Sequence, residues 1–427
     1  MRWFTSLFSQ YKGLRKEIYI LFFGRVVTSF GSMIWPMLTM ILSRKMGLSA
    51  TMIAVVTVGA GALMLPANLL GGRLADRRDK KMTIVYCDTA SIVCLLAAAA
   101  LPLSYFTLGL FAAAGVCQSM EYPSYNALIA DLTKTRDRDR AYSLQYLGGN
   151  LGLVLSPTIG GLLFENYLWL AFLIGGVSIA VSTLLIFFKI KDVTPEPDDG
   201  QEAVYQQGKE EQSLTRVLRE NPLIVLFLVS MSLYFAAYGM YTYLLPLDMG
   251  RVHGDNGAVI YGTVSSLNCI VVVLFTPVIT RLFRKLFDPQ RILIGQALVA
   301  VGYAVFLLLL GSVPVYYLAM LLFTWGEIFS TIAEEPYLTA RVPATHRGRI
   351  NGFFAVVNAV LQGGVELLAG RLYDAAGSAA AWTLVLGVLG LSAAVMLVLL
   401  PRDKKTYPLL WTRQPEPAKP GPETSEQ

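Results

Sequence analysis

The stretch Gly-Gly-Arg-Leu-Ala-Asp-Arg-Arg-Asp-Lys-Lys, from Gly71 to Lys81, places seven charges between two long apolar runs. A segment with this many charges must lie outside the hydrocarbon of a membrane. Its glycines allow two helices to approach closely, and Asp76 can lie near the positive end of a neighbouring helix. Five of the charges are cations, which favour the cytoplasmic side. The stretch therefore predicts a cytoplasmic turn between two membrane-spanning helices.

The whole chain is too apolar for a soluble protein. Of its 427 residues, 55% are hydrophobic and 15% are charged, and the mean hydropathy is +0.54. This composition indicates a polytopic protein embedded in a lipid bilayer. The net charge of +6 comes from cations in short loops and not from one helix face, which argues against nucleic-acid binding.

Apolar runs of about 20 residues or more divide the chain into two halves. They begin near residues 17, 50, 82, 106, 141 and 168, and again near 222, 257, 290, 314, 347 and 379. We therefore expect an all-α membrane protein with twelve transmembrane helices in two six-helix bundles. Its expected parts are an amphipathic surface helix at 1–16, a first bundle at 17–190, a cytoplasmic linker at 191–221, a second bundle at 222–400 and a disordered cytoplasmic tail at 401–427.

Two sequence echoes suggest that the halves are related. The segment from Arg138 at the start of the fifth run is similar to the segment from Arg347 at the start of the eleventh. Glu121-Tyr-Pro in the fourth run is echoed by Glu334-Glu-Pro in the tenth. Duplicated halves of this kind form transporters with a central site between them. The pattern thus predicts pseudo-symmetric bundles.

The loop cations set the expected orientation. With both termini in the cytoplasm, 30 of the 35 Lys and Arg residues fall on the cytoplasmic side, and four fall on the other side. The remaining cation, Arg25, lies inside the first run. This asymmetry predicts a multi-pass protein of the plasma membrane with cytoplasmic termini. Arg44 and Lys45 are local exceptions to the rule.

The turn from Gly71 to Lys81 resembles the signature that the major facilitator superfamily carries between helices 2 and 3, Gly-x-Leu-Ala-Asp-Arg-x-Gly-Arg-Lys. The matching residues are Gly72, Leu74, Ala75, Asp76, Arg77, Lys80 (conservatively) and Lys81. Asp79 stands where the family usually has glycine. A basic turn between apolar segments is also common in other membrane proteins. The resemblance implies the major facilitator fold and a conformational latch formed by Gly72, Asp76, Arg77 and Lys81, in which Asp76 contacts the start of helix 11.

The fifth run contains a second motif, Gly-Leu-Val-Leu-Ser-Pro-Thr-Ile-Gly-Gly at residues 152–161. It resembles the antiporter signature of major facilitator drug exporters, Gly-x-x-x-Gly-Pro-x-x-Gly-Gly. The motif residues are Gly152, Ser156 in place of the second glycine, Pro157, Gly160 and Gly161. Small residues at this spacing also form tight helix interfaces in importers, so both interpretations stay open. The counterpart in the second half keeps Gly370 and has Glu366 at the proline position.

Ionisable residues inside the apolar runs are candidates for function, because each costs about 2.5 to 3.5 kcal/mol to insert. At about 1.5 Å per residue, Arg25 lies about 12 Å and Glu121 about 16 Å from the cytoplasmic boundary, so they can meet. An arginine partner favours an ionised carboxylate, whereas burial favours the protonated form. A switch between these environments couples proton uptake to transport; the alternative is a permanent structural ion pair. The other candidates are Asp88, Glu327, Glu334, Glu335 and Glu366, of which Glu334 and Glu327 are alternative proton sites.

Aromatic residues supply candidates for substrate binding. Tyr234 and Tyr238 lie deep in the seventh run and Trp35 lies in the first, and Glu327 adds a carboxylate. Such surfaces bind apolar or cationic ligands through stacking and cation–π contacts. Aromatic residues near the ends of the runs also fit an interfacial belt.

The sequence contains no P-loop, metal-ligand cluster or nucleophile motif. We therefore expect no enzyme activity, no cofactor and no metal, and transport driven by a gradient. The resemblance to the bacterial drug:proton antiporters, over about residues 17–400, implies proton-coupled efflux of amphipathic or drug-like small molecules by a monomer. The alternatives are a nutrient importer and a flippase for a lipid-linked headgroup.

Overall fold

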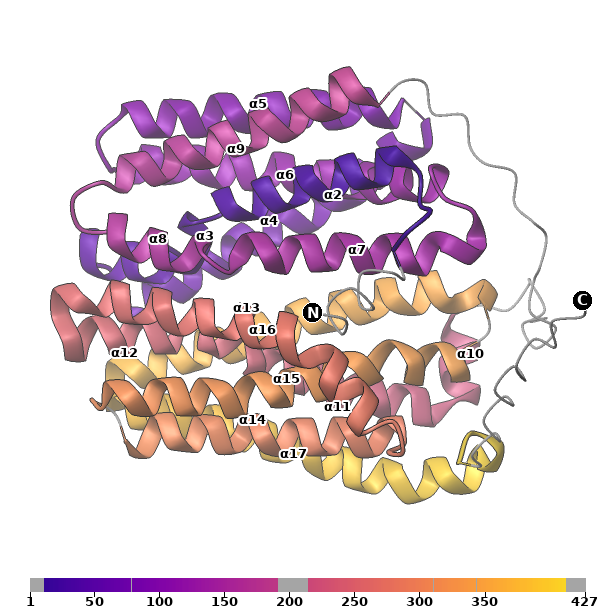
Figure 1. The fold of residues 1–427 in the computed structure, drawn as a ribbon. Helices are drawn as coiled ribbons and strands as arrows, with labels where there is room; N and C mark the ends of the chain where they lie inside the picture. Colours follow the sequence, from indigo (N-terminus) through magenta and orange to yellow (C-terminus); the bar gives the residue numbers. More distant parts are fainter. Residues whose placement is uncertain (1–10, 78, 191–213, 310, 343, 412–427) are drawn as a thin grey trace, which may run out of the picture.

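A computed structural model describes residues 11–77, 79–190, 214–309, 311–342 and 344–411. Its elements are all helical within these ranges. Figure 1 shows two groups of roughly parallel helices, the first formed by α2 to α9 and the second by α10 to α17. We call them the N-half and the C-half.

The N-half fills the part of the chain before residue 190. Its elements are α2 (Lys16–Gly31), α3 (Ile34–Met40), η1 (Ile41–Lys45), α4 (Ala50–Arg77), α5 (Lys80–Ala100), α6 (Tyr105–Asp131), α7 (Thr135–Leu153), α8 (Ser156–Leu163) and α9 (Leu168–Lys189).

The C-half repeats this arrangement after a short helix. Its elements are α10 (Leu214–Glu220), α11 (Pro222–Tyr238), η2 (Gly239–Tyr241), α12 (Leu244–His253), η3 (Gly254–Asn256), α13 (Gly257–Leu282), α14 (Asp288–Leu308), α15 (Val313–Arg341), α16 (Ala344–Ala376), α17 (Ser378–Thr406) and η4 (Pro408–Trp411).

The helices account for the twelve expected crossings. Ten segments of the described chain are long and apolar enough to span a membrane. One of them, the 61-residue segment Pro222–Leu282, is far longer than the roughly 20 residues that one crossing needs, and contains two. The helix α6 supplies the twelfth. We call the end of the bundle where α2 begins and α17 ends the terminal end, and the opposite end, beyond η1 and α12, the far end.

Three crossings are broken in the middle, and each break falls four residues before a proline. The first crossing breaks near Ser32 before Pro36, the fifth at Leu153 before Pro157, and the seventh near Thr242 before Pro246. A proline ring clashes with the carbonyl four residues earlier and donates no backbone hydrogen bond. The prolines therefore explain why these three crossings consist of two helical pieces.

The turn predicted at Gly71 to Lys81 is much shorter than expected. The helix α4 continues to Arg77 and α5 begins at Lys80, so only residues 78 and 79 separate them. Asp79 Oδ1 accepts a hydrogen bond from the Met82 amide at 3.2 Å, which makes Asp79 the N-cap of α5. An N-cap acid stabilises a helix start, and this role explains an aspartate in place of glycine.

The chain ends also differ from the prediction. Tyr11 to Arg15 are not helical, and Tyr11 is only 9% exposed because its hydroxyl lies 3.0 Å from Ser143 Oγ. The tail expected from residue 401 is still helical, since α17 runs to Thr406 and η4 to Trp411. The buried Asp403 carboxylate accepts hydrogen bonds from Arg341 at 2.7 Å, which holds this extension against α15. Residues 1–10 and 412–427 lie outside the described chain.

Candidate functional site

A cavity of about 420 Å³ lies between the two halves, and we call it the central cavity. It is bordered by α2, α6 and α7 of the N-half and by α11, η2, α13 and α15 of the C-half. Toward the terminal end it reaches Ile129 and Tyr142, close to the ends of α6 and α7. Its lining residues are Arg25, Ser29, Tyr122, Tyr125, Asn126, Ile129, Tyr142, Gln145, Tyr146, Gly149, Asn150, Leu153, Tyr238, Tyr241, Asn268, Cys269 and Glu327.

Glu327 is the one carboxylate among these lining residues. It lies near the middle of α15, where Asn268 Nδ2 donates to Glu327 Oε2 at 2.7 Å. Asn268 Nδ2 also lies 3.0 Å from Thr324 Oγ1, one turn earlier on α15. Asn268 therefore fixes the position of a half-buried acid that faces the central cavity, an arrangement that can bind a cationic group.

Aromatic rings form the wall next to this carboxylate. Tyr238 stacks on Phe323 with 5.1 Å between ring centroids, and Tyr241 lies 5.1 Å from the same ring. Tyr238 lines the central cavity as proposed for substrate binding. Tyr234 does not, because it is 1% exposed within the core of the C-half.

A second cavity of about 350 Å³ lies within the N-half, and we call it the N-half cavity. Arg25, Tyr122 and Tyr125 line both cavities, so the two spaces meet at these side chains. Trp35 also lines the N-half cavity, and its ring lies 4.8 Å from that of Phe111. The predicted aromatic residues are thus divided between two cavities and the core.

Glu121 and Arg25 both line the N-half cavity, as their depths in the sequence suggested. The structure describes both side chains and joins them by no ion pair in this state. The structure therefore does not contain the permanent ion pair between Arg25 and Glu121 that was the alternative interpretation. The two side chains line one partly polar cavity inside the N-half, where their interaction is stronger than in water.

Asp88 is a third ionisable residue that lines this cavity, and the sequence analysis named it as a candidate without a specific role. It is 7% exposed, and the Thr183 hydroxyl lies 2.7 Å from its Oδ2 atom. Only the presence of an acid in an apolar run pointed to it, because its partner lies 95 residues away on α9.

The remaining acids of α15 lie apart from both cavities. Glu334 is partly buried and Glu335 is exposed, and neither lines the central or the N-half cavity. They lie seven and eight residues beyond Glu327, toward the terminal end. Of these acids, Glu327 therefore lines the central cavity and Glu334 does not.

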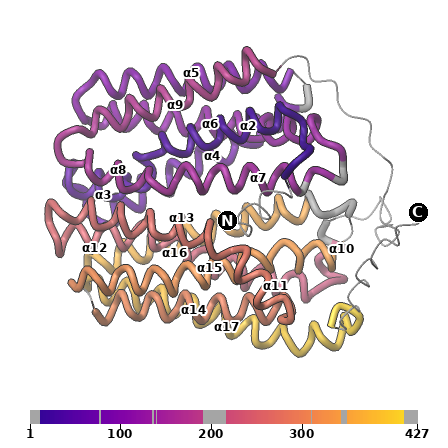
Figure 2. Tube along the Cα trace, viewed as in Figure 1, coloured from indigo at the N-terminus to yellow at the C-terminus, as the bar shows by residue number. Residues whose placement is uncertain are grey.

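The motif at residues 152–161 lies at helix contacts on both sides. A Cβ atom on Gly152 would lie 2.3 Å from the Val26 carbonyl of α2, and one on Gly161 would lie 2.4 Å from the Ala258 carbonyl of α13. Reciprocally, a Cβ atom on Gly262 would lie 2.3 Å from the Pro157 carbonyl. The tube in Figure 2 shows α8 next to α13.

The other motif residues follow the same pattern. A Cβ atom on Gly160 would lie 2.9 Å from the Met33 carbonyl, and Ser156 is fully buried. Beside Pro157, Thr158 Oγ1 donates to Ser266 Oγ of α13 at 2.7 Å. The motif therefore connects the two halves toward the far end.

The structure describes the surroundings of two of the four residues of the predicted latch, Gly72 and Lys81. Gly72 faces open space, and Lys81 Nζ lies 5.4 Å from the centre of the Phe187 ring. The side chains of Asp76 and Arg77, and with them the predicted contact to the start of helix 11, lie outside the described structure.

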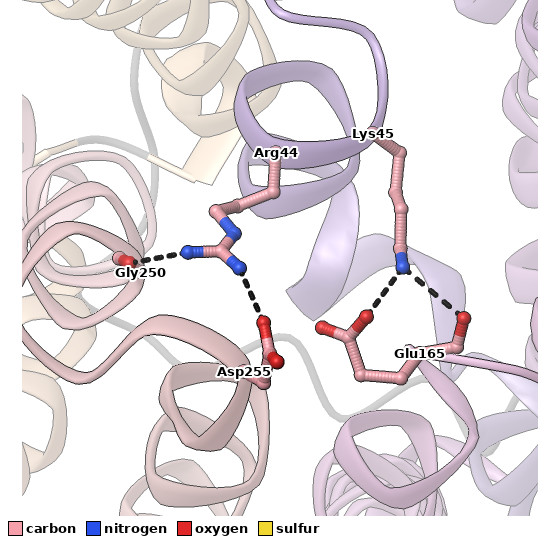
Figure 3. Close-up of polar contacts among 5 residues, drawn as sticks. All are labelled: Arg44, Lys45, Glu165, Gly250 and Asp255. Carbon is pink, nitrogen blue, oxygen red and sulfur yellow. Dashed lines mark hydrogen bonds and ion pairs between the residues drawn. The ribbon is translucent and has the colours of Figure 1, made fainter.

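Polar contacts close the far end of the bundle. Figure 3 shows Arg44 reaching across to the C-half, where it donates to the Gly250 carbonyl at 2.9 Å and to Asp255 at 2.7 Å. Lys45 stays in the N-half and donates to Glu165 Oε2 at 2.6 Å. These acids explain how two cations are tolerated at the end where the sequence predicts few.

Two further contacts join the halves at the same end. The Tyr243 hydroxyl donates to the Ala50 carbonyl at 2.6 Å. Asp374 of α16 accepts from the amides of Ala50 and Thr51 at 3.0 and 2.8 Å, so it caps the start of α4 from the other half. The structure is therefore closed at the far end, and the central cavity extends toward the terminal end.

Comparisons with known proteins agree with this architecture. The family model described as Major Facilitator Superfamily matches residues 21–365. The uncharacterized MFS-type transporter YqjV of Bacillus subtilis (strain 168) is 27% identical over 311 residues, covering 72% of this chain and 73% of that protein. A Na(+), Li(+), K(+)/H(+) antiporter of Planococcus maritimus is 24% identical over 347 residues, covering 75% and 81%. The multidrug resistance protein MdtG of Serratia proteamaculans (strain 568) is 27% identical over 240 residues, covering 55% and 56%.

Solved structures share the fold at low sequence identity. A POT family transporter in complex with 5-aminolevulinic acid superposes with a TM-score of 0.75 at 15% identity, covering 92% of this chain and 97% of that one. A bacterial homologue of the human lysosomal transporter Spinster, inward-facing and unoccupied, gives a TM-score of 0.66 at 15% identity, covering 93% and 97%. With twelve helices in two halves, a cavity between them and a family match over most of its length, the chain belongs to the Major Facilitator Superfamily, whose members are membrane transporters and not enzymes.

Proposed function

We propose that this transporter exports amphipathic, cationic small molecules in exchange for protons by alternating access. The observation that carries the proposal is that one carboxylate, Glu327, lines the central cavity together with the aromatic side chains of Tyr238 and Tyr241. A carboxylate beside aromatic faces suits a ligand that combines a positive charge with an apolar ring. The relatives named for multidrug resistance and for cation/proton antiport support the general class.

Proton binding is assigned to the N-half cavity. Glu121 is the proposed proton site and Arg25 its counter-charge, because both line the N-half cavity. When Arg25 turns toward Glu121, the ionised carboxylate is favoured, and when it turns toward the central cavity, the protonated form is favoured. Since Arg25 lines both cavities, its position couples the charge of Glu121 to the contents of the central cavity.

The proposed export also depends on the orientation of the chain in the membrane. We place the terminal end in the cytoplasm because it carries most of the loop cations. The central cavity then opens to the cytoplasm in this structure, where it loads substrate. The turn around Asp76 and Arg77 is the proposed latch that closes the terminal end in the opposite state.

The test is a transport panel in proteoliposomes with an imposed pH gradient. It contains aromatic cations, neutral aromatic analogues of the same shape, alkali metal ions, dipeptides and nucleosides, and a pH dye reports proton movement. We expect uptake of aromatic cations against their gradient with proton movement in the opposite direction. Transport of alkali ions alone, or of peptides or nucleosides together with protons, would contradict the proposal.

A further inference from the structure

The carboxyl group of Glu366 lies in the contact between α4 and α16, where the two halves meet toward the closed far end. The Thr57 hydroxyl of the N-half forms a hydrogen bond with Glu366 of the C-half. On both sides of this pair the helices are in close contact. A Cβ atom on Gly363 would lie 3.1 Å from the Val58 side chain, and one on Gly370 would lie 3.0 Å from the Ala50 carbonyl. Glu366 is therefore held between the halves while the far end is closed.

The Thr57 hydroxyl is the hydrogen-bond partner that the described residues offer to this carboxyl. Thr57 Oγ1 lies 2.9 Å from the Ile53 carbonyl and 3.2 Å from the Ala54 carbonyl, besides its bond to Glu366. A hydroxyl has one proton to donate and can also accept. This one proton cannot serve Glu366 and the Ile53 carbonyl at once, and threonine commonly donates to such a carbonyl within a helix, so a protonated Glu366 satisfies the contact better than an ionised one.

Among the described residues, the helices packed against α16 place no cation at the level of Glu366. On α4 between Ala50 and Ala75 the one charged residue is Arg73, at the terminal end, and α11 carries no charged residue. The charged residues of α10 and α17 also lie at the terminal end. The remaining titratable or charged groups around it are Tyr243, before α12, and Arg371, Tyr373 and Asp374, farther along α16.

We propose that Glu366 is a proton-binding site whose protonation permits the far end to close. The inference rests on the alternating-access part of the proposed function and does not depend on the substrate. When the far end opens, Glu366 meets water and loses its proton to the far-end solution. Before the halves can close again, the carboxylate must take one proton from that solution, because an ionised carboxylate without a partner is costly between packed helices.

Asp374 can be compared with Glu366, because it is an acid on the same helix that also contacts α4 where the far end is closed. Its two oxygens accept from the amides of Ala50 and Thr51 and, at 2.6 Å, from the Thr51 hydroxyl. These donors lie at the N-terminus of α4, where an ionised carboxylate is favoured. Removing the charge of Asp374 therefore weakens a contact that holds the far end closed. Removing the charge of Glu366, by contrast, gives the neutral side chain that the closed far end requires.

The experiment measures the opening of the far end without transport. Spin labels are placed at Asn166 of the N-half and Ser312 of the C-half, both exposed at the far end, in the full-length chain with its four cysteines replaced. Distances between the labels are recorded in detergent or nanodiscs from pH 5 to pH 9. We expect the short distance to dominate at low pH and the long distance to grow as the pH rises, by up to about tenfold per pH unit for one coupled proton.

Two variants show whether Glu366 causes the pH dependence of the opening. Glu366→Gln is expected to keep the short distance at every pH, and Asp374→Asn is expected to favour the long distance while keeping the pH dependence. A Glu366→Gln protein that still opens with rising pH overturns the inference, as does a wild-type protein with no pH response. Because no substrate is present, a failed transport panel alone leaves these distances unchanged, so the two proposals fail separately.

Discussion

At the scale of single residues, Glu327 is expected to select for positive charge, because it is the one carboxylate among the residues that line the central cavity. Glu327→Gln keeps the shape and the bond from Asn268 but removes the charge. A charge-assisted hydrogen bond contributes about 1.5 to 3 kcal/mol, so the affinity for aromatic cations should fall about 10- to 100-fold. Binding is measured by tryptophan fluorescence or calorimetry with the purified protein.

Glu334→Gln is the matched control, because Glu334 lies on the same helix and lines neither cavity. Its affinity for the same cations should stay within about twofold of wild type. An equal loss of affinity for neutral analogues in Glu327→Gln would mean that the side chain acts by packing and not by charge.

Glu121 carries the second prediction at this scale. Glu121→Gln fixes a neutral side chain in the N-half cavity and should abolish accumulation driven by a pH gradient. Exchange of labelled for unlabelled substrate should continue, because the movement of the halves requires a neutral side chain there but no proton cycle. Both are measured in proteoliposomes, with the exposed Glu335→Gln as control. Continued proton movement with substrate in Glu121→Gln would assign the proton to another acid.

At the scale of elements, the contact between α8 and α13 depends on Gly161 of α8 and Gly262 of α13. A Cβ atom on Gly161 would lie 2.4 Å from the Ala258 carbonyl, so Gly161→Ala must push the halves apart. Overpacking of this kind costs about 1 to 3 kcal/mol. We expect a shift toward the open far end, measured by faster reaction of a cysteine at Thr158 with a thiol reagent.

Gly59→Ala on α4 is the control, because nothing lies within 4 Å of the added Cβ atom. Unchanged reactivity in both variants would show that the motif does not set the closure of the far end.

The helices could largely be predicted from the sequence, but the side chains that line the cavity could not. The apolar runs give the twelve crossings, and the proline positions account for the three breaks. Tyr234 and Tyr238, by contrast, lie one helical turn apart on one face, yet one is buried and the other lines the cavity. Their rings lie 6.0 Å apart, and the cavity ends between them because neighbouring helices cover Tyr234. Sequence periodicity cannot locate such an edge, because it depends on packing between distant helices.

At the scale of the whole molecule, the loop cations predict that both termini and the linker lie in the cytoplasm. Cysteines introduced at Gln201 and Ser425, which lie outside the described residues, should resist an impermeant thiol reagent in intact cells. A cysteine at Asn166, exposed at the far end, should react. The reverse pattern would overturn the orientation and, with it, the proposed direction of transport.

The ion pairs at Arg44 and Lys45 also set an order of events during synthesis. Lys45 finds Glu165 within the N-half, whereas Asp255, the partner of Arg44, is made 211 residues after it. At about 5 to 20 residues per second, Arg44 waits on the order of 10 to 40 s for its acid. The contact between Arg44 and Asp255, which joins the two halves, can therefore form only after the start of the C-half has been made.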